Sequence, residues 1–241
     1  MVVLTTLTLK FTATAIHALA QISSLARLVY RSQRTRLYSD DACACLAMSF
    51  SLAWLACIWT PNLVDITTTE YVSYTQSIKA LTYGMDSALV LAVIWLSRIS
   101  LFLASTRILP VGFLHRSLPF SGLLLFIAMD TSSEIGPSHK CDSTGRASIV
   151  TEITFKFLSD IVIFAVPIIG FLSCSRNRHQ APDRVSLTLT SCAAATITAT
   201  SIVHAIFLIL GLEHLSDLTT AIESGVSLMA VNIAATVGVG L

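Results

Sequence analysis

The sequence has 241 residues, of which 54% are hydrophobic and only 12% are charged, and its formal net charge is +1. Soluble domains carry about 25% charged residues, so this chain cannot build a water-exposed surface of ordinary composition. The near-zero net charge excludes the basic surface that binds nucleic acid, and the high hydrophobicity excludes intrinsic disorder. The composition predicts an all-α, polytopic membrane protein whose first partner is the lipid bilayer.

Charged and turn residues divide the chain into seven apolar segments, each a candidate for a membrane-crossing helix of about 20 residues. The segments are 5–29, 42–60, 80–105, 116–130, 147–173, 185–212 and 218–241. The fourth is the shortest, and the connections are too short to contain a soluble domain. We therefore expect one transmembrane domain of seven helices over residues 1–241.

Basic residues are distributed unevenly between alternate connections. Counted with Arg27 and Arg116 at their edges, the connections after the first, third and fifth segments hold nine Lys and Arg residues, and the others hold three. Because basic loops are retained in the cytosol, this asymmetry predicts an outside N-terminus, in the plasma membrane. Residues 1–39 are rich in Arg, Ser and Thr, which also fits a mitochondrial transit peptide and leaves the mitochondrial inner membrane as an alternative.

Ionisable residues within the predicted helices are the candidates for a site, because a charge at bilayer depth costs about 2.5–3.5 kcal/mol on insertion scales. Glu152, Lys156 and Asp160 are spaced four residues apart and therefore share one side of the fifth helix. They predict either a polar face that lines a ligand cavity or proton path, or an internal ion pair that neutralises itself. Asp86, in the third helix, is expected to pair with Lys156 or Lys10.

Polar residues also occur in the third, sixth and seventh helices. Arg98 lies near the inner boundary of the third helix, where a long side chain reaches the lipid headgroups. A stripe at i+4 spacing in the sixth helix predicts close helix packing, with a substrate groove as the alternative. The stripe is Thr188, Cys192, Thr196, Thr200 and His204. The predicted ligand-binding residues are Asp86, Glu152, Lys156, Asp160, His204 and Glu223.

Motifs for catalysis, metal binding and cofactor binding are missing from the sequence. No Cys/His cluster has zinc spacing, and no metalloprotease, nucleophile-elbow or P-loop motif occurs. We therefore expect no enzyme activity, no metal and no cofactor. Cys57 and Cys141 would both face the oxidising outer compartment, where a disulfide between them is one alternative.

Several short motifs between Ser39 and Asn232 match a known family. They are Asp40-Asp41, Trp95-Leu-Ser-Arg98-Ile-Ser, Arg107-Ile-Leu-Pro110, Asp160 before Pro167, Glu223 and Val231-Asn232. On these motifs the chain resembles the fungal rhodopsin-like-domain integral membrane proteins, a seven-helix, receptor-like family. The resemblance implies seven helices, an outside N-terminus and a sensing role. It does not imply retinal, because segment 218–241 has no lysine for a Schiff base.

Three functions remain open from the sequence. The first is a receptor-like sensor of an unknown small ligand, and the second is a proton- or ion-coupled transporter that uses the same residues. The third is a shortened, non-signalling membrane subunit, since the sequence stops at Leu241 without the basic cytosolic tail usual in the family. Without that tail, coupling to a G protein is not expected.

Overall fold

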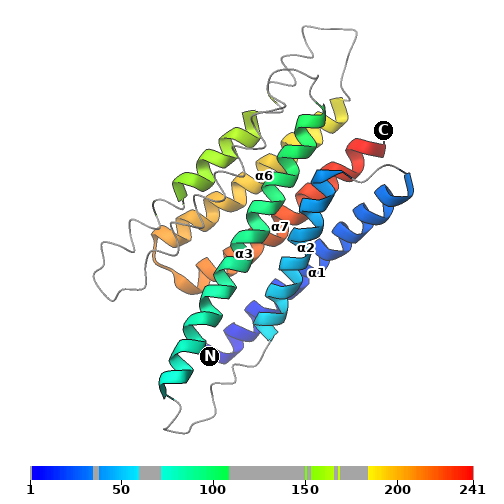
Figure 1. Ribbon diagram of the computed structural model, residues 1–241. Coiled ribbons are helices and arrows are strands. Elements are labelled where there is room, and N and C mark those ends of the chain that lie inside the picture. The colour runs from blue at the N-terminus through cyan, green and yellow to red at the C-terminus, as the bar shows by residue number, and fades with distance from the viewer. Residues whose placement is uncertain are drawn as a thin grey trace.

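A computed structural model describes residues 2–34, 38–59, 72–108, 150, 153–165, 168 and 184–240. Its long helices are α1 (Val2–Arg34), α2 (Ser39–Trp59), α3 (Val72–Ile108), α6 (Arg184–Ile209) and α7 (Glu213–Gly240). A shorter helix spans residues 153–165. The helices lie along a common long axis (Figure 1), and these described ranges contain no strand. The all-helical prediction is confirmed for this part of the chain. The predicted helix 116–130 lies outside it.

Four stretches are long and apolar enough to cross a membrane. They are Ser39–Trp59, Gly84–Ser105, Val185–Ile209 and Leu215–Thr236. They coincide with the second, third, sixth and seventh predicted segments. The described chain is therefore compatible with a multi-pass membrane protein in contact with lipid.

The helix ends follow from local sequence. Asp41 caps the N-terminus of α2. Its Oδ2 accepts the backbone N–H of Tyr38 at 3.0 Å, and Tyr38 O accepts the backbone N–H of Asp41 at 3.0 Å. The Asp41 side chain thus makes the reach-back bond of a capping box, while the backbone of Tyr38 makes the other bond. Gly211 has φ +66° and ends α6, with the N–H of Leu212 bonded to Phe207 O. That left-handed cap turns the chain at once into α7, so α6 and α7 become antiparallel neighbours.

α7 occupies the centre of the described bundle, in contact with α1, α3 and α6, while α2 packs mainly against α3. α1 and α7 are in close contact at Gly225. A Cβ atom on Gly225 would lie only 2.5 Å from Ile16 Cγ2, so a glycine is required for this spacing. Small residues allow such close helix contact in membranes.

Consecutive described helices run in opposite directions, except for α3 and helix 153–165. α1, α3 and α7 run in one direction and α2 and α6 run in the other (Figure 1). Helix 153–165 is antiparallel to α6, because Ile163 packs with Ile197 at one end while Ile153 and Leu208 meet at the other. Helix 153–165 therefore runs parallel to α3, the helix that precedes it in the described chain.

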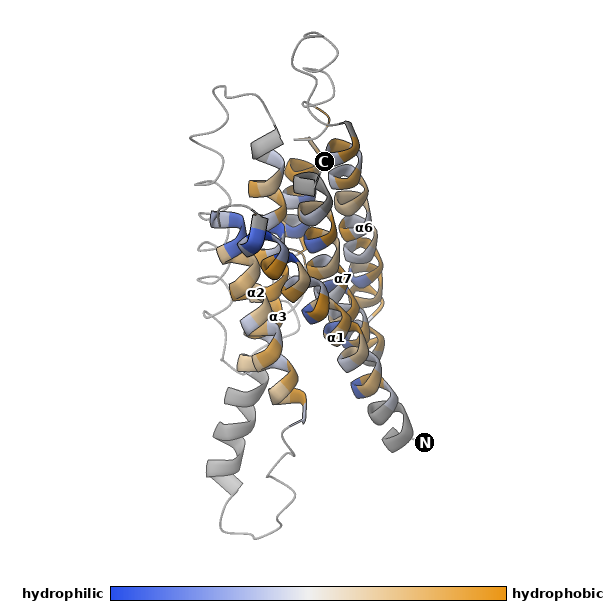
Figure 2. Cartoon of the chain, turned by 90° about the vertical axis from the view of Figure 1, so that its right-hand side faces the viewer, coloured by the Kyte–Doolittle hydropathy of each residue, from blue (hydrophilic) through white to orange (hydrophobic). Residues whose placement is uncertain are grey.

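The described bundle exposes many large apolar side chains and buries many polar ones beside its apolar core. Phe11 and Ile22 of α1 are 60% and 66% exposed, whereas Arg27 and Glu223 are fully buried. Figure 2 shows hydrophobic residues over most of the helices, with a hydrophilic cluster where α1 ends and α2 begins. Globular proteins in water seldom bury Arg or Glu completely. This distribution is the one expected where lipid surrounds the helices.

The i+4 stripe predicted to pack α6 faces outward over most of its length. Thr188, Cys192 and Thr196 are exposed, and only His204 at the end is buried. The packing prediction is wrong for these three residues because four residues advance a helix by about 40° more than one turn. The stripe therefore winds around α6. The buried face instead includes Ala194, Ile197, Ser201 and His204.

Candidate functional site: two buried ion clusters and a cavity

Four ionisable residues meet at the centre of the bundle, and we call them the central ion cluster: Arg98, Lys156, Asp160 and Glu223. Arg98 Nη2 lies 3.1 Å from Asp160 Oδ1 and 3.4 Å from Glu223 Oε1. Lys156 Nζ lies 3.5 Å from Glu223 Oε2. Each residue is at most 5% exposed. Two cations and two acids balance one another, as buried charges must.

The central ion cluster is positioned by four helices. Lys156 and Asp160 are four residues apart on helix 153–165, so they share one face, as predicted. α3 contributes Arg98 and α7 contributes Glu223, while α6 adds a hydroxyl bridge. Arg98 Nη2 donates to Ser201 Oγ at 2.7 Å, and Ser201 Oγ donates to Glu223 Oε1 at 2.8 Å. A change in this network therefore alters contacts of four helices: α3, helix 153–165, α6 and α7.

Arg98 is the hub of the cluster, and the prediction that it extends to the headgroups is wrong. Its side chain is 2% exposed, and its guanidinium carbon lies 5.6 Å from the centre of the Trp95 ring. Buried opposite charges on α7 and helix 153–165 hold it inside. Within the described residues, Arg98 Nε and Nη1 have no hydrogen-bond partner. Two buried N–H donors beside the cluster thus lack an acceptor among these residues, which costs free energy unless another group accepts their hydrogen bonds.

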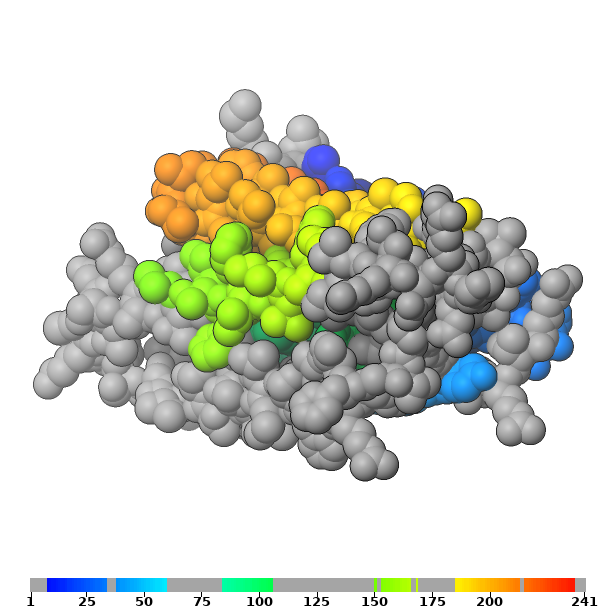
Figure 3. All heavy atoms as spheres, turned by 90° about the horizontal axis from the view of Figure 1, so that it is seen from above, coloured from blue at the N-terminus to red at the C-terminus, as the bar shows by residue number. Residues whose placement is uncertain are grey.

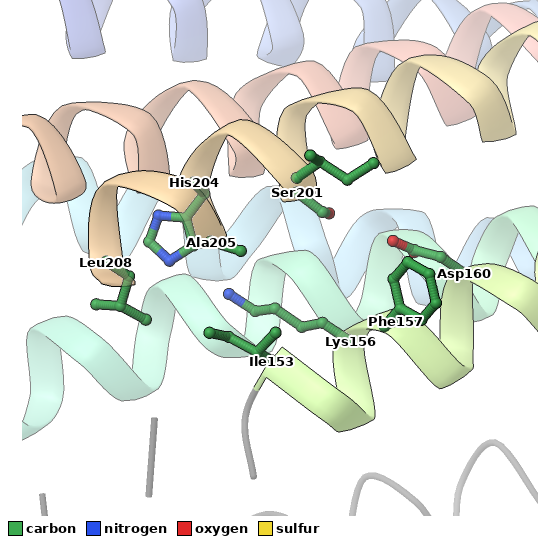
Figure 4. A pocket seen from close by; sticks show the side chains of 9 residues that line it. Ile153, Lys156, Phe157, Asp160, Ser201, His204, Ala205 and Leu208 are labelled. Carbon is green, nitrogen blue, oxygen red and sulfur yellow. The ribbon is translucent and has the colours of Figure 1, made fainter. Parts of the chain in front are cut away.

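A cavity of about 40 Å³ borders the cluster between helix 153–165 and α6. Its walls are mostly apolar, and its polar lining residues are Lys156, Asp160, Ser201 and His204. Figure 4 shows the Lys156 amine extending toward His204 and the Asp160 carboxylate turned toward Ser201. One water needs about 10–15 Å³, so the cavity has room for about three waters or one small polar group.

His204 joins the cavity to α7. Its Nδ1 lies 3.2 Å from Thr219 Oγ1 and 3.1 Å from Thr220 Oγ1. The imidazole is buried and oriented by these hydroxyls. The structure therefore brings together four of the predicted ligand-binding residues: Lys156, Asp160, His204 and Glu223.

The other predicted residues are not part of this assembly. Asp86 is half-buried on α3 near Trp54 and Asp217. Its expected partner Lys156 pairs with Glu223 instead, and none of the ion pairs between described residues contains Asp86. Glu152 lies outside the described residues. So does Cys141, and its disulfide with Cys57 stays a prediction.

A second charged group, which we call the terminal ion cluster, ties the end of α1 to the start of α2. It consists of Arg27, Arg31, Asp40 and Asp41. Arg27 Nη2 lies 2.8 Å from Asp40 Oδ2 and 3.0 Å from Asp41 Oδ1. Arg31 Nη1 lies 2.8 Å from the same two oxygens. All four side chains are at most 3% exposed.

The terminal ion cluster also reaches α3 and α7. Arg27 Nη1 lies 3.4 Å from both Ser100 Oγ and Asn232 Oδ1, and Arg31 Nη2 donates to Ala235 O at 3.1 Å. The sequence placed both arginines in a cytosolic connection, which is wrong because α1 continues to Arg34. Their i, i+4 spacing just before Asp40-Asp41 was the signal that could have identified the cluster.

His17 is a further buried polar residue that was not among the predicted site residues. Its Nδ1 lies 2.7 Å from Ser51 Oγ, and its Nε2 lies 3.2 Å from Ala221 O. A carbonyl oxygen only accepts hydrogen bonds, so Nε2 carries the proton. The ring also packs against Trp54, with centroids 4.6 Å apart and the ring planes tilted by 46°. His17 thus connects α1, α2 and α7 at the level of Glu223.

The central ion cluster and its cavity offer both hydrogen-bond donors and acceptors at the depth of a bilayer. A polar group that enters the cavity can exchange with one of the existing ion-pair partners. Ionisable groups at such depth are functional candidates by default, because insertion disfavours them. No protein-family model, curated protein or solved structure matches the chain.

Proposed function

We propose that the chain is a multi-pass, receptor-like membrane protein that senses a small ligand at the cavity beside the central ion cluster. The observation that carries this proposal is the contact of one cavity with an ion-pair network that joins α3, helix 153–165, α6 and α7. A ligand that pairs with Lys156 or Asp160 competes with those interhelical contacts. It then favours a different helix arrangement by the difference between its affinities for the two states.

The proposed protein has seven membrane-crossing helices, as in the receptor-like family that the sequence resembles. The parallel run of α3 and helix 153–165 supports this number. If both cross the bilayer, the chain between Ile108 and residue 153 has to return to the starting side. The predicted helix at 116–130 would supply that crossing.

The outward face of α1 supports its role as the first crossing, although α1 is not one of the four most apolar stretches. Exposed apolar residues extend along α1 from Phe11 to Val29. They cover about 27 Å at 1.5 Å per residue, close to the bilayer's hydrocarbon thickness of about 30 Å. With Arg27 and Arg31 assigned to the terminal ion cluster, seven basic residues still oppose three, which supports an outside N-terminus.

The sensing proposal predicts that weakening the central ion cluster changes the position of α6. We expect Lys156→Met to raise the population of a second α6 position by about tenfold or more, since a hydrogen bond to a charged group contributes about 1.5–3 kcal/mol. Spin-label distances between Leu52 on α2 and Ile206 on α6, both exposed, measure that population in lipid nanodiscs.

A reference pair on Leu52 and Met85 links α2 to α3 without crossing the cluster, and its distance should not change. If the Leu52–Ile206 distance has the same single value in the wild type and in Lys156→Met, the sensing role is contradicted. That result would favour a purely structural membrane subunit. A change in both pairs would indicate general loosening and also count against the proposal.

A proton- or ion-coupled transporter is the second candidate function. The observation that favours it is the series of buried polar residues on α7, from Ser216 through Glu223 and Ser227 to Asn232. These positions extend over about 24 Å of helix. Proton flux into proteoliposomes under an imposed potential separates the two functions, because a receptor should give no flux above protein-free vesicles.

A further inference from the structure

The mouth of the cavity opens toward the lipid. Helix 153–165 and α6 lie side by side on one face of the molecule (Figure 3), and the cavity is between them. Phe157 and Ile202, two of its lining residues, are 54% and 45% exposed. In a helix that crosses a bilayer, exposed large apolar side chains contact acyl chains rather than water. A ligand therefore approaches the cavity from within the bilayer.

The size of the cavity limits what enters it. Sites that enclose a whole organic ligand measure about 300–1,000 Å³, whereas this cavity measures about 40 Å³. Only a small head group fits. The rest of the ligand has to lie outside the cavity, along exposed apolar side chains of helix 153–165 and α6 such as Ile161 and Val203. The ligand is thus an amphiphile with a small head and a long apolar body.

The polar lining determines the chemistry of the head group. Lys156 supplies an ammonium donor on one side, and Asp160 supplies a carboxylate on the other. Asp160 Oδ1 lies 3.1 Å from Arg98 but accepts no hydrogen bond of good geometry from the described residues. The head group must therefore accept a hydrogen bond and also donate one.

The charge of the head group is limited as well. The two cations and two acids of the central ion cluster already balance. A phosphate or a quaternary ammonium group would add an unpaired charge at bilayer depth, at a cost of several kcal/mol. A protonated carboxyl group adds no charge, since its carbonyl oxygen accepts from Lys156 and its hydroxyl donates to Asp160.

We propose that the cavity binds the protonated carboxyl group of a long-chain fatty acid that enters from the bilayer between helix 153–165 and α6. This inference rests on the proposed ligand site and names the chemical class of its ligand. The acyl chain lies along the outer faces of the two helices, and the carboxyl group bridges Lys156 and Asp160. Occupation then weakens the pairing of those residues with Glu223 and Arg98.

The test uses the full chain in phosphatidylcholine nanodiscs with a photoactivatable fatty acid that carries a diazirine in its chain. Labelling of helix 153–165 and α6 is measured by mass spectrometry of the peptides. We expect oleic acid to displace the label at least about tenfold better than methyl oleate or oleyl alcohol. The ester lacks the donor, and the alcohol has one oxygen rather than two with which to bridge the residues. Equal displacement by all three would overturn the proposal.

A cavity-filling variant gives a second, independent test. Ala205 lines the cavity, so Ala205→Leu should abolish the specific labelling. Ala53→Leu makes the same change on the exposed face of α2 and should leave the labelling unchanged. Unreduced labelling of Ala205→Leu would overturn the proposal, and if this variant fails to fold, the displacement series on the wild type decides.

The result is separable from the test of the proposed function. Fatty-acid binding without movement of α6 would support this inference and contradict the sensing role. Movement of α6 in Lys156→Met without selective fatty-acid binding would support the sensing role and refute this inference.

Discussion

Arg27→Met should lower the free energy of unfolding by about 3–5 kcal/mol, the usual cost of removing one partner from a buried ion pair. Arg27 is fully buried and contacts both acids of α2, Ser100 of α3 and Asn232 of α7. Its loss leaves two buried carboxylates against a single arginine. Unfolding of the protein by denaturing detergent in mixed micelles, followed by circular dichroism, measures the change.

Arg27→Lys is the matched control for charge. It keeps the positive charge but loses the planar fork that reaches several acceptors at once, so its loss of stability should be clearly smaller. A loss for Arg27→Met below about 1 kcal/mol, in the range of exposed ion pairs, would contradict the burial of the terminal ion cluster.

Arg98→Met should lower the free energy of unfolding by a similar amount, about 3–5 kcal/mol, because it leaves Asp160 and Glu223 buried with Lys156 alone. The charge balance of the central ion cluster predicts a specific rescue. Adding Asp160→Asn removes the surplus negative charge, so the double variant should recover stability relative to Arg98→Met. The expected interaction energy in a double-mutant cycle is about 0.5–3 kcal/mol.

The rescue distinguishes an ion cluster from a simple loss of packing. Asp217→Asn on the exposed side of α7 is the control, because it removes one acid outside the cluster and should rescue nothing. Additive effects of Arg98→Met and Asp160→Asn would indicate that the two residues do not interact. The proposed coupling between the cavity and α3 would then fail.

The parts of the fold that follow from hydropathy were predictable. The apolar runs of α2, α3, α6 and α7 identify these helices without any knowledge of their neighbours. The i+4 spacing likewise placed Lys156 and Asp160 on one face. Spacing within one helix cannot reveal how that helix is rotated against another, so the pairing of Lys156 with Glu223 was not predictable.

The partners of the buried arginines were likewise not predictable from the sequence. Positive charges near helix ends were assigned to loops or headgroups because the sequence gives their position along the chain and not their partners. Arg98 and Arg27 are instead held inside by acids on other helices. The α6 stripe was misjudged because a strict i+4 repeat winds around a helix of 3.6 residues per turn. Each error concerns a contact between helices that only the folded arrangement determines.

Lipid should surround the outward apolar faces of this bundle. Single nitroxide labels at Ile22, Leu52 and Ile206, which are exposed on α1, α2 and α6, test it in liposomes. We predict high collision rates with oxygen and low rates with a water-soluble nickel complex at all three positions, and higher nickel rates at Ser39 where α2 begins. Nickel collision rates at the three apolar positions equal to that at Ser39 would place these faces in water and contradict the account.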